Sequence, residues 1–139
     1  MTQQSSLTQI RLQALLLADH IYQDQGSGKY VIAGTFHRLN VAAVPTTFAR
    51  TIGVFVSLSG LTGKTGIDLD FVDALSGEVL ICTRSLEVAC EDPDLPVEFA
   101  VEVPPLPLPH SGRYLFRLMV AGMVLGTAAV TVRSPGDKG

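Results

Sequence analysis

The chain has 139 residues, 47% of them hydrophobic and 17% charged, with a formal net charge of −3. This length suits one domain that buries a core without a disulfide or a metal ion, and the composition excludes a disordered chain. Its ten lysines and arginines form no basic run, so we expect neither a nucleic-acid partner nor an anionic membrane surface.

The N-terminal residues predict neither a secretory leader nor a membrane span. Residues 1–6 contain no Lys or Arg, Arg11 interrupts the apolar segment, and Asp19 follows it directly. No segment approaches the ~18 apolar residues that span a bilayer. Cys82 and Cys90 lie in one expected strand, too far apart for a disulfide, which indicates reduced apolar residues. We therefore expect a cytoplasmic protein with no membrane partner.

Turn sequences recur at short intervals, at 25–28, 61–66, 76–77, 91–94 and 121–122. This spacing is typical of a sandwich or barrel and not of alternating strands and helices. Eight strands are expected between the turns, at 12–23, 29–40, 51–59, 66–73, 78–89, 96–103, 112–121 and 122–133. Pro45 lies in the link between the second and third strands. The prolines between 104 and 109 predict a stiff, extended crossing between the sixth and seventh.

The first segment fits two patterns. Its apolar residues from Leu7 to Ile21 recur at steps of three and four, as in a helix, but residues 21–32 read as a β-hairpin. A strand from about residue 12 is favoured, and whether residues 5–17 are partly helical stays open. The expected organisation is a partly flexible lead-in at 1–11, one domain at 12–133 and a flexible tail at 134–139.

Apolar and polar residues alternate strictly in three of the expected strands. The residues of the core face are Ile52, Val54, Val56, Leu58, Ile67, Leu69, Phe71, Val97, Phe99, Val101 and Val103. Such alternation places one face of a strand on the core and the other in water, as in antiparallel sheets. The pattern predicts an all-β, antiparallel sandwich.

Residues 109–116, which read Pro-His-Ser-Gly-Arg-Tyr-Leu-Phe, resemble the entry to strand F of immunoglobulin-like domains. The resemblance implies that Tyr114 is a tyrosine-corner residue, with its hydroxyl bonded to the backbone upstream. Phe116 stands where an antibody domain has Cys, and the chain has no Trp, so the antibody-type Cys–Trp–Cys arrangement is excluded. The prediction is an immunoglobulin-like sandwich of about eight strands.

From about residue 14 to residue 132 the chain is similar to an uncharacterised bacterial family of small all-β proteins. The matching residues are Ala18-Asp19-His20, Asp24, Ser27-Gly28-Lys29, Gly34-Thr35-Phe36, Arg38, Pro45, Val72-Asp73, Ser76-Gly77-Glu78-Val79 and Gly112-Arg113-Tyr114. This resemblance supports the fold and implies no particular activity.

No pattern predicts a metal site. A hairpin with its turn at 24–29 places His20 opposite Ala33 and about 13 Å from His37, too far for a shared metal ion, and His110 lies in the proline-rich crossing. Asp68 and Asp70 alternate as on a solvated sheet face, and residues 91–94 form a polar turn.

No catalytic motif is present either. Residues 60–65 end in Gly-Lys-Thr but lack the first glycine of a phosphate loop, and an alternating strand follows them. The chain has no Gly-x-Ser-x-Gly elbow. We therefore expect a non-enzymatic protein with no catalytic residue, no cofactor and no metal.

The hypothesis for a working surface is an apolar patch of Phe55, Leu115, Met119 and Val124. If Tyr114 points inward, Leu115 and Met119 point outward. Phe55 joins them if the third strand shares a sheet with the last two, and Val124 joins through a two-residue turn at 121–122. A bulge at Gly126 would return the later residues of the last strand to the core. The N-terminal segment or a loop covering the patch is an equal alternative.

The function expected from this patch is a binding or assembly domain for a protein partner or for a second copy in a homodimer. The alternative is a small-ligand or carbohydrate-binding sandwich. A flat apolar face would favour the first, and a pocket lined by Tyr22, Tyr30 and acidic side chains would favour the second.

Overall fold

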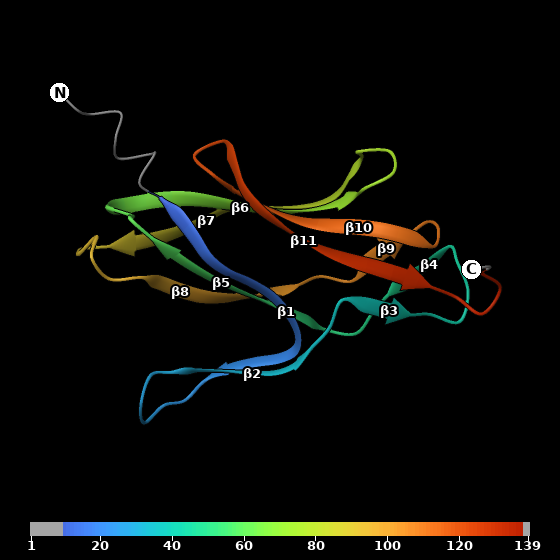
Figure 1. Ribbon diagram of the computed structural model, residues 1–139, viewed down its shortest axis with the longest axis horizontal. Helices are drawn as coiled ribbons and strands as arrows, with labels where there is room; N and C mark the ends of the chain where they lie inside the picture. The colour runs from blue at the N-terminus through green and yellow to red at the C-terminus, as the bar shows by residue number, and fades with distance from the viewer. Residues whose placement is uncertain (1–9, 138–139) are drawn as a thin grey trace.

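The computed structural model describes residues 10–137, apart from the side chains of residues 84 and 85, and consists of two packed β-layers (Figure 1). Eleven strands lie in this range, where about eight were predicted: β1 (Arg11–Gln23), β2 (Tyr30–Thr35), β3 (Arg38–Asn40), β4 (Thr46–Phe48), β5 (Ile52–Ser59), β6 (Gly63–Asp73), β7 (Val79–Cys90), β8 (Val97–Val103), β9 (Leu106–Leu108), β10 (Gly112–Val120) and β11 (Met123–Arg133). None of the described residues is helical, so no helix among them is long and apolar enough to cross a bilayer.

The strands form a four-stranded sheet in the order β2-β1-β5-β8 and a five-stranded sheet in the order β3-β11-β10-β6-β7. All pairs are antiparallel except β3 with β11. The two sheets match those of an immunoglobulin-like domain. In the first sheet β1, β5 and β8 correspond to strands A, B and E. In the second sheet β6, β10 and β11 correspond to strands C, F and G. The predicted fold class is confirmed.

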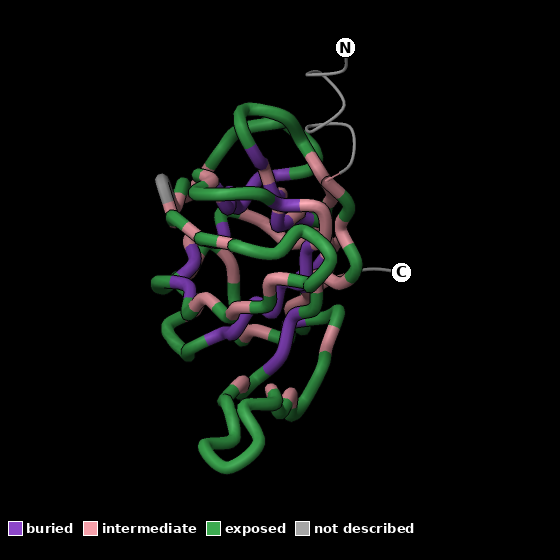
Figure 2. Tube along the Cα trace, turned by 90° about the vertical axis from the view of Figure 1, so that its left-hand side faces the viewer, coloured by how far each residue is buried: buried purple, intermediate pink, exposed green. Residues whose placement is uncertain are grey.

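Strand β1 is shared between two partners. Its first part pairs with β5 and its second part with β2, and Ala18 is opposite both Gly53 and Thr35. The β1–β2 hairpin therefore leaves the body of the sheet, as the exposed loop at the bottom of Figure 2 shows. His20 lies opposite Ala33, as predicted. The expected strand at 29–40 is split, because the chain turns at Gly34 (φ 78°) and enters the other sheet as β3.

The link and the crossing that contain prolines form a small third sheet. Thr46–Phe48 of β4 pairs with Leu106–Leu108 of β9, and Leu106 and Leu108 are buried. Pro107 lacks an N–H, which a short two-stranded sheet tolerates. Eight strands were too few partly because these two short segments were read as connections.

The core lies between the two sheets and consists of the alternating residues that the sequence predicted. Strands β5, β6 and β10 contribute the fully buried Val54, Val56, Leu58, Ile67, Phe71, Tyr114, Phe116 and Leu118. The Phe71 and Tyr114 rings stack at 5.2 Å with an interplanar angle of 9°. In β8, Val103 is buried, whereas the other inward residues Val97, Phe99 and Val101 are only partly buried, because β8 is the edge of its sheet.

A β-bulge in β11 decides which of its residues reach the core. Met119 is opposite Val124 and Leu118 is opposite Gly126, so Leu125 is the additional residue. The bulge shifts the register by one, and Val130 and Val132 are buried as a result. The bulged alternative for this strand is confirmed. A Cβ at Gly126 would collide with Leu12, so the glycine also allows β1 to approach β11.

Tyr114 forms the predicted corner. Its side chain is completely buried, its hydroxyl donates a hydrogen bond to the carbonyl of His110 at 2.6 Å, and the His110 N–H donates to the hydroxyl at 3.2 Å. One side chain thus serves both backbone polar groups of His110, and it fixes where β10 begins.

Replacing Tyr114 with Phe should lower the free energy of unfolding by about 1 kcal/mol or more, because two buried backbone groups lose their partner. Denaturant unfolding measures this, with Tyr22→Phe as the control at a tyrosine that is 57% exposed. An unchanged midpoint for Tyr114→Phe would contradict the structural role of the corner.

Candidate functional site

The outer surface of the five-stranded sheet carries most of the residues that the sequence singled out. Its outward side chains lie in rows across neighbouring strands: Arg38, Thr131 and Arg113; then Ala129, Leu115 and Val72; then Thr127, Arg117 and Asp70; then Val124, Met119 and Asp68. Arg133 lies two residues beyond Thr131 on the same side of β11. We call this surface the arginine face. Leu115, Met119 and Val124 all belong to it, as predicted.

An ion pair lies at the centre of the arginine face. Arg117 Nη2 donates to Asp70 Oδ2 at 2.9 Å across β10 and β6, and the Asp70 side chain is 7% exposed. Asp70 Oδ1 and Arg117 Nε are buried and have no hydrogen-bond partner among the described side chains. The pair holds the guanidinium against the sheet between Leu115 and Met119, its neighbours on the same face of β10.

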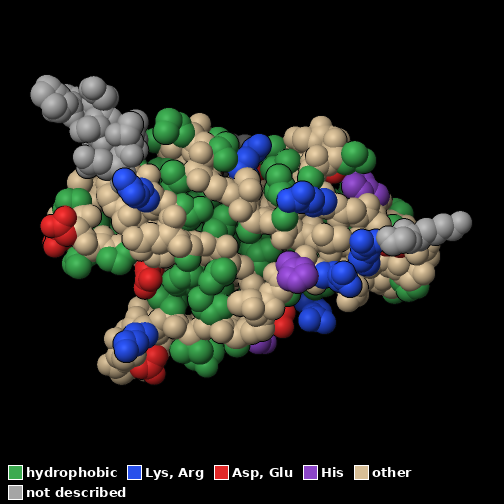
Figure 3. All heavy atoms as spheres, in the orientation of Figure 1, with side chains coloured by type: hydrophobic (Ala, Val, Ile, Leu, Met, Phe, Trp, Pro, Cys, Tyr) green, Lys and Arg blue, Asp and Glu red, His purple; other side chains and the backbone are tan. Residues whose placement is uncertain are grey.

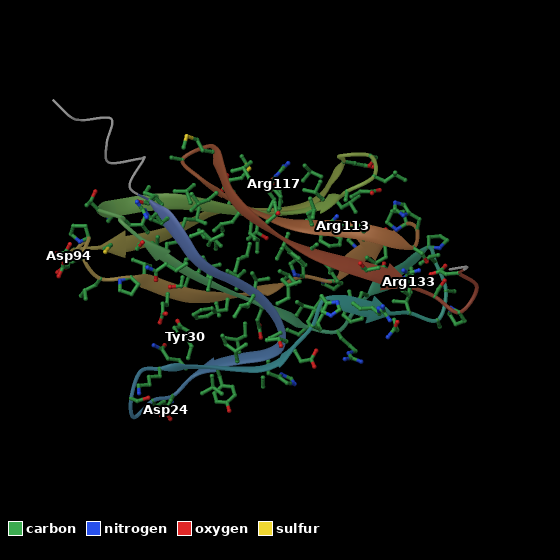
Figure 4. All side chains as sticks on the ribbon, viewed as in Figure 1. Asp24, Tyr30, Asp94, Arg113, Arg117 and Arg133 are labelled. Atoms are coloured by element: carbon green, nitrogen blue, oxygen red, sulfur yellow. The ribbon has the colours of Figure 1, made fainter. Side chains whose placement is uncertain are left out.

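The other three arginines of this face lack an ion-pair contact within the described range, although Arg133 lies close enough to Asp137 for the two charges to interact. Among the described residues Arg38, Arg113 and Arg133 form no ion pair. Figure 3 shows Lys and Arg side chains gathered over β3, β10 and β11, and Figure 4 shows Arg113, Arg117 and Arg133 along one side of the molecule. The surface is therefore a positively charged sheet face with apolar residues between the charges.

Phe55 does not belong to this surface, and the predicted four-residue patch is wrong in this respect. It lies in β5, in the other sheet, and its outward ring is only 6% exposed. The Tyr30 ring of the hairpin packs against it at 5.3 Å, and the Tyr30 hydroxyl donates to the carbonyl of Glu98 at 3.4 Å. The prediction failed because β2 is an additional edge strand beyond β1, which occupies the place of strand A. The third expected strand is thus B and not C. Phe55 itself is covered by Tyr30 of β2.

A hollow of about 530 Å³ lies between the hairpin and the four-stranded sheet. Its walls are Asp19, His20, Ile21, Tyr22, Thr51, Gly53, Ala100, Val101 and Glu102. Gly53 forms part of the floor, and a Cβ there would lie 2.9 Å from Ile21. The hollow contains Tyr22 and two acidic residues, as the ligand-binding alternative required, but Tyr30 lies against Phe55 and does not line it.

A polar cluster beside the tyrosine corner was missed by sequence reasoning. His110 Nε2 lies 2.6 Å from Asp73 Oδ2, and His110 Nδ1 lies 2.7 Å from the carbonyl of Ser111. Both ring nitrogens face acceptors, so a protonated ring can donate one hydrogen bond from each nitrogen. No sequence signal identified the cluster, because Asp73 and His110 meet only through the pairing of β6 with β10.

The same contacts shift the pKa values of the pair in opposite directions. Hydrogen bonding to the Ser111 carbonyl and to Asp73 raises the pKa of His110 above its ordinary value of 6.5, although partial burial opposes this. Burial raises the pKa of Asp73, but hydrogen bonds from His110 and from the Leu75 N–H outweigh it, and the pKa lies below 3.8. Within the described residues, no three His, Cys, Asp or Glu side chains are grouped to hold a metal ion.

A model of a protein family matches residues 13–133, and its description is a family of unknown function, DUF6941. The chain belongs to this family. The relationship inferred from the sequence, to small all-β proteins without an assigned activity, is confirmed. No curated protein matches the chain.

Two solved structures are similar to this chain. The alkylpurine DNA glycosylase AlkC of Pseudomonas fluorescens, solved with DNA containing an abasic-site analogue, is similar with a TM-score of 0.59 and 13% identity over 90% of this chain. The match spans only 30% of AlkC. An immunoglobulin-like protein of Pseudomonas aeruginosa has a TM-score of 0.48 and 12% identity, over 90% of this chain and 97% of that one. At these identities the likeness concerns the fold alone.

The His110–Asp73 pair predicts a stability maximum at mildly acidic pH. The contribution of His110 is fully present below 6.5 and is lost as the pH rises through its raised pKa. The contribution of Asp73 is present above 3.8 and is lost as the pH falls through its lowered pKa. Unfolding free energies measured from about pH 3 to pH 9 should fall at both ends. His110→Asn should remove the decline at high pH, and His37→Asn, at an exposed histidine outside the cluster, should leave it in place.

Proposed function

We propose that this chain is a non-enzymatic binding domain that holds a protein partner on the arginine face. The observation that supports this is the outward side of β10, where half-buried Leu115 and Met119 alternate with Arg113 and Arg117. Arg and Met are enriched at protein–protein interfaces, where apolar residues form the centre and polar residues the rim. Val124, at the margin of the face, is 55% exposed.

One further feature supports a binding role over a catalytic one, and a second supports the proposed compartment. The His110–Asp73 pair, which most resembles catalytic machinery, has both ring nitrogens in use. Cys82 and Cys90 form no disulfide, which suits the reducing cytoplasm that we propose for the protein.

A double variant tests the proposal. Leu115→Glu with Met119→Glu should abolish complex formation, because each change places a charge at the apolar centre of the face. Partners retained by the immobilised native protein in host extract would be identified, purified and measured against both forms by calorimetry. The control is Leu16→Glu with Val31→Glu, at exposed apolar residues of the other sheet. A folded double variant that binds the purified partner as well as the native protein would refute the proposal.

The hollow beneath the hairpin supports a second candidate function, the binding of a small polyol or sugar. Tyr22 offers an exposed ring for stacking, and Asp19 and Glu102 offer carboxylates that accept hydrogen bonds from hydroxyl groups. Saturation-transfer NMR with a panel of free mono- and disaccharides should then give signals that Tyr22→Ala removes and Tyr114→Phe retains. Equal signals from native protein and Tyr22→Ala would exclude the hollow as the site.

A further inference from the structure

The three unpaired arginines form a compact cationic group at one end of the arginine face. Arg38 and Arg113 lie on either side of Thr131 in adjacent strands, which places their Cα atoms roughly 10 Å apart. Arg133 is about 7 Å further along β11 from Thr131. Asp137 accepts hydrogen bonds from the Ser134 N–H at 2.7 Å and the Ser134 hydroxyl at 3.1 Å, and its negative charge also interacts with Arg133. Arg38 and Arg113 have no ion pair among the described residues, so an external anion can bind to them and share Arg133 with Asp137.

The rest of the molecule is acidic. The net charge is −3, and many of the exposed acids lie away from this face, on Glu98 and Glu102 of β8, on Asp19 and Asp24 of the hairpin and in the 91–94 loop. Glu78 and Glu87 lie at the β6–β7 side of the sheet, and Asp68 lies half-buried in the last row of the face. On the arginine face itself Asp70 is buried in its pair with Arg117. Charge complementarity governs which partners approach such a surface, so the occupant carries negative charge.

A second copy fits this surface poorly. A two-fold axis along β10 would bring Arg113 of one molecule against Arg113 of the other, and neither has an ion pair among the described residues. Like charges opposed across an interface cost several kcal/mol. The geometry of β10 therefore disfavours the symmetric dimer that a purely apolar patch would favour.

A nucleic acid also fits poorly. Single-stranded nucleic acids bind where a cationic groove is combined with aromatic rings that stack on bases. Among its described residues the arginine face contains no Phe, Tyr or Trp, and its centre is the aliphatic row of Ala129, Leu115 and Val72.

We infer that the occupant of the arginine face is an acidic segment of another protein in which carboxylates alternate with apolar side chains. The carboxylates bind Arg38, Arg113 and Arg133, whose planar guanidinium groups suit carboxylates in paired hydrogen bonds. The apolar side chains pack on Leu115 and Met119. This inference rests on the proposed function and specifies the chemistry of its partner.

The experiment is an NMR titration of the full-length protein with a short synthetic peptide of alternating Glu and Leu. Amide shifts should appear first in β3, β10 and β11, and a matched peptide of Gln and Leu should bind about tenfold more weakly or less. The triple variant Arg38→Gln, Arg113→Gln and Arg133→Gln should weaken binding of the acidic peptide by a similar factor. Arg11→Gln, Lys29→Gln and Arg50→Gln together make the same change in net charge away from the face, and should leave binding unchanged.

Four outcomes would overturn the inference. The first two are that the two peptides bind equally well, or that millimolar peptide causes no amide shifts on this face. The third is that oligothymidylate binds the same residues more tightly than the acidic peptide does. The fourth is that the native protein self-associates and the triple variant self-associates more strongly. If the triple variant binds the purified native partner normally while the Leu115 and Met119 double variant does not, the proposed function is supported. In that case the inference that the partner is acidic is refuted. If both variants bind the purified native partner normally, the proposed function and the inference are both refuted.

Discussion

The hydrogen bonds between the Tyr114 hydroxyl and the backbone of His110 are the constraint on which the rest of the structure depends. They anchor the start of β10 while the ring itself is buried against Phe71. Because side chains alternate along a strand, fixing one inward residue fixes every other residue of β10. Phe116 and Leu118 then enter the core, and Arg113, Leu115, Arg117 and Met119 must face outward. The corner thus sets the composition of the arginine face without contributing to it.

The sequence predicted what depends on local pattern. Alternation gave the core residues of β5 and β6, turn residues gave most strand limits, and the Ser-Gly-Arg-Tyr segment gave the corner. The sequence-based prediction failed where the result depends on which strands pair with each other. Both sheets are built from segments distant in the chain, and nothing in residues 51–59 states that β5 pairs with β1 and β8 and not with β10.

The candidate surface shows the same division. Leu115, Met119 and Val124 were found because they lie on one hairpin, whose register follows from its turn. The cationic group was not found, because Arg38 reaches Arg113 only through the parallel pairing of the three-residue strand β3 with β11. A strand of that length has almost no periodicity to detect. The net charge of the chain did not indicate the cationic group either, because it sums a basic face and an acidic opposite layer.

The position of β8 at the margin of its sheet has a consequence for assembly. An edge strand has unpaired backbone groups with which another chain can pair, and long, flat, apolar edge strands lead to fibres. Here Pro96 and Pro104 bracket the strand, and Glu98 and Glu102 project from it. Prolines cannot extend a ladder, and the two carboxylates repel a copy of the same strand laid alongside. Association through backbone pairing at this edge is thereby discouraged, so the exposed margin of the four-stranded sheet at β8 does not serve as a template for a further strand.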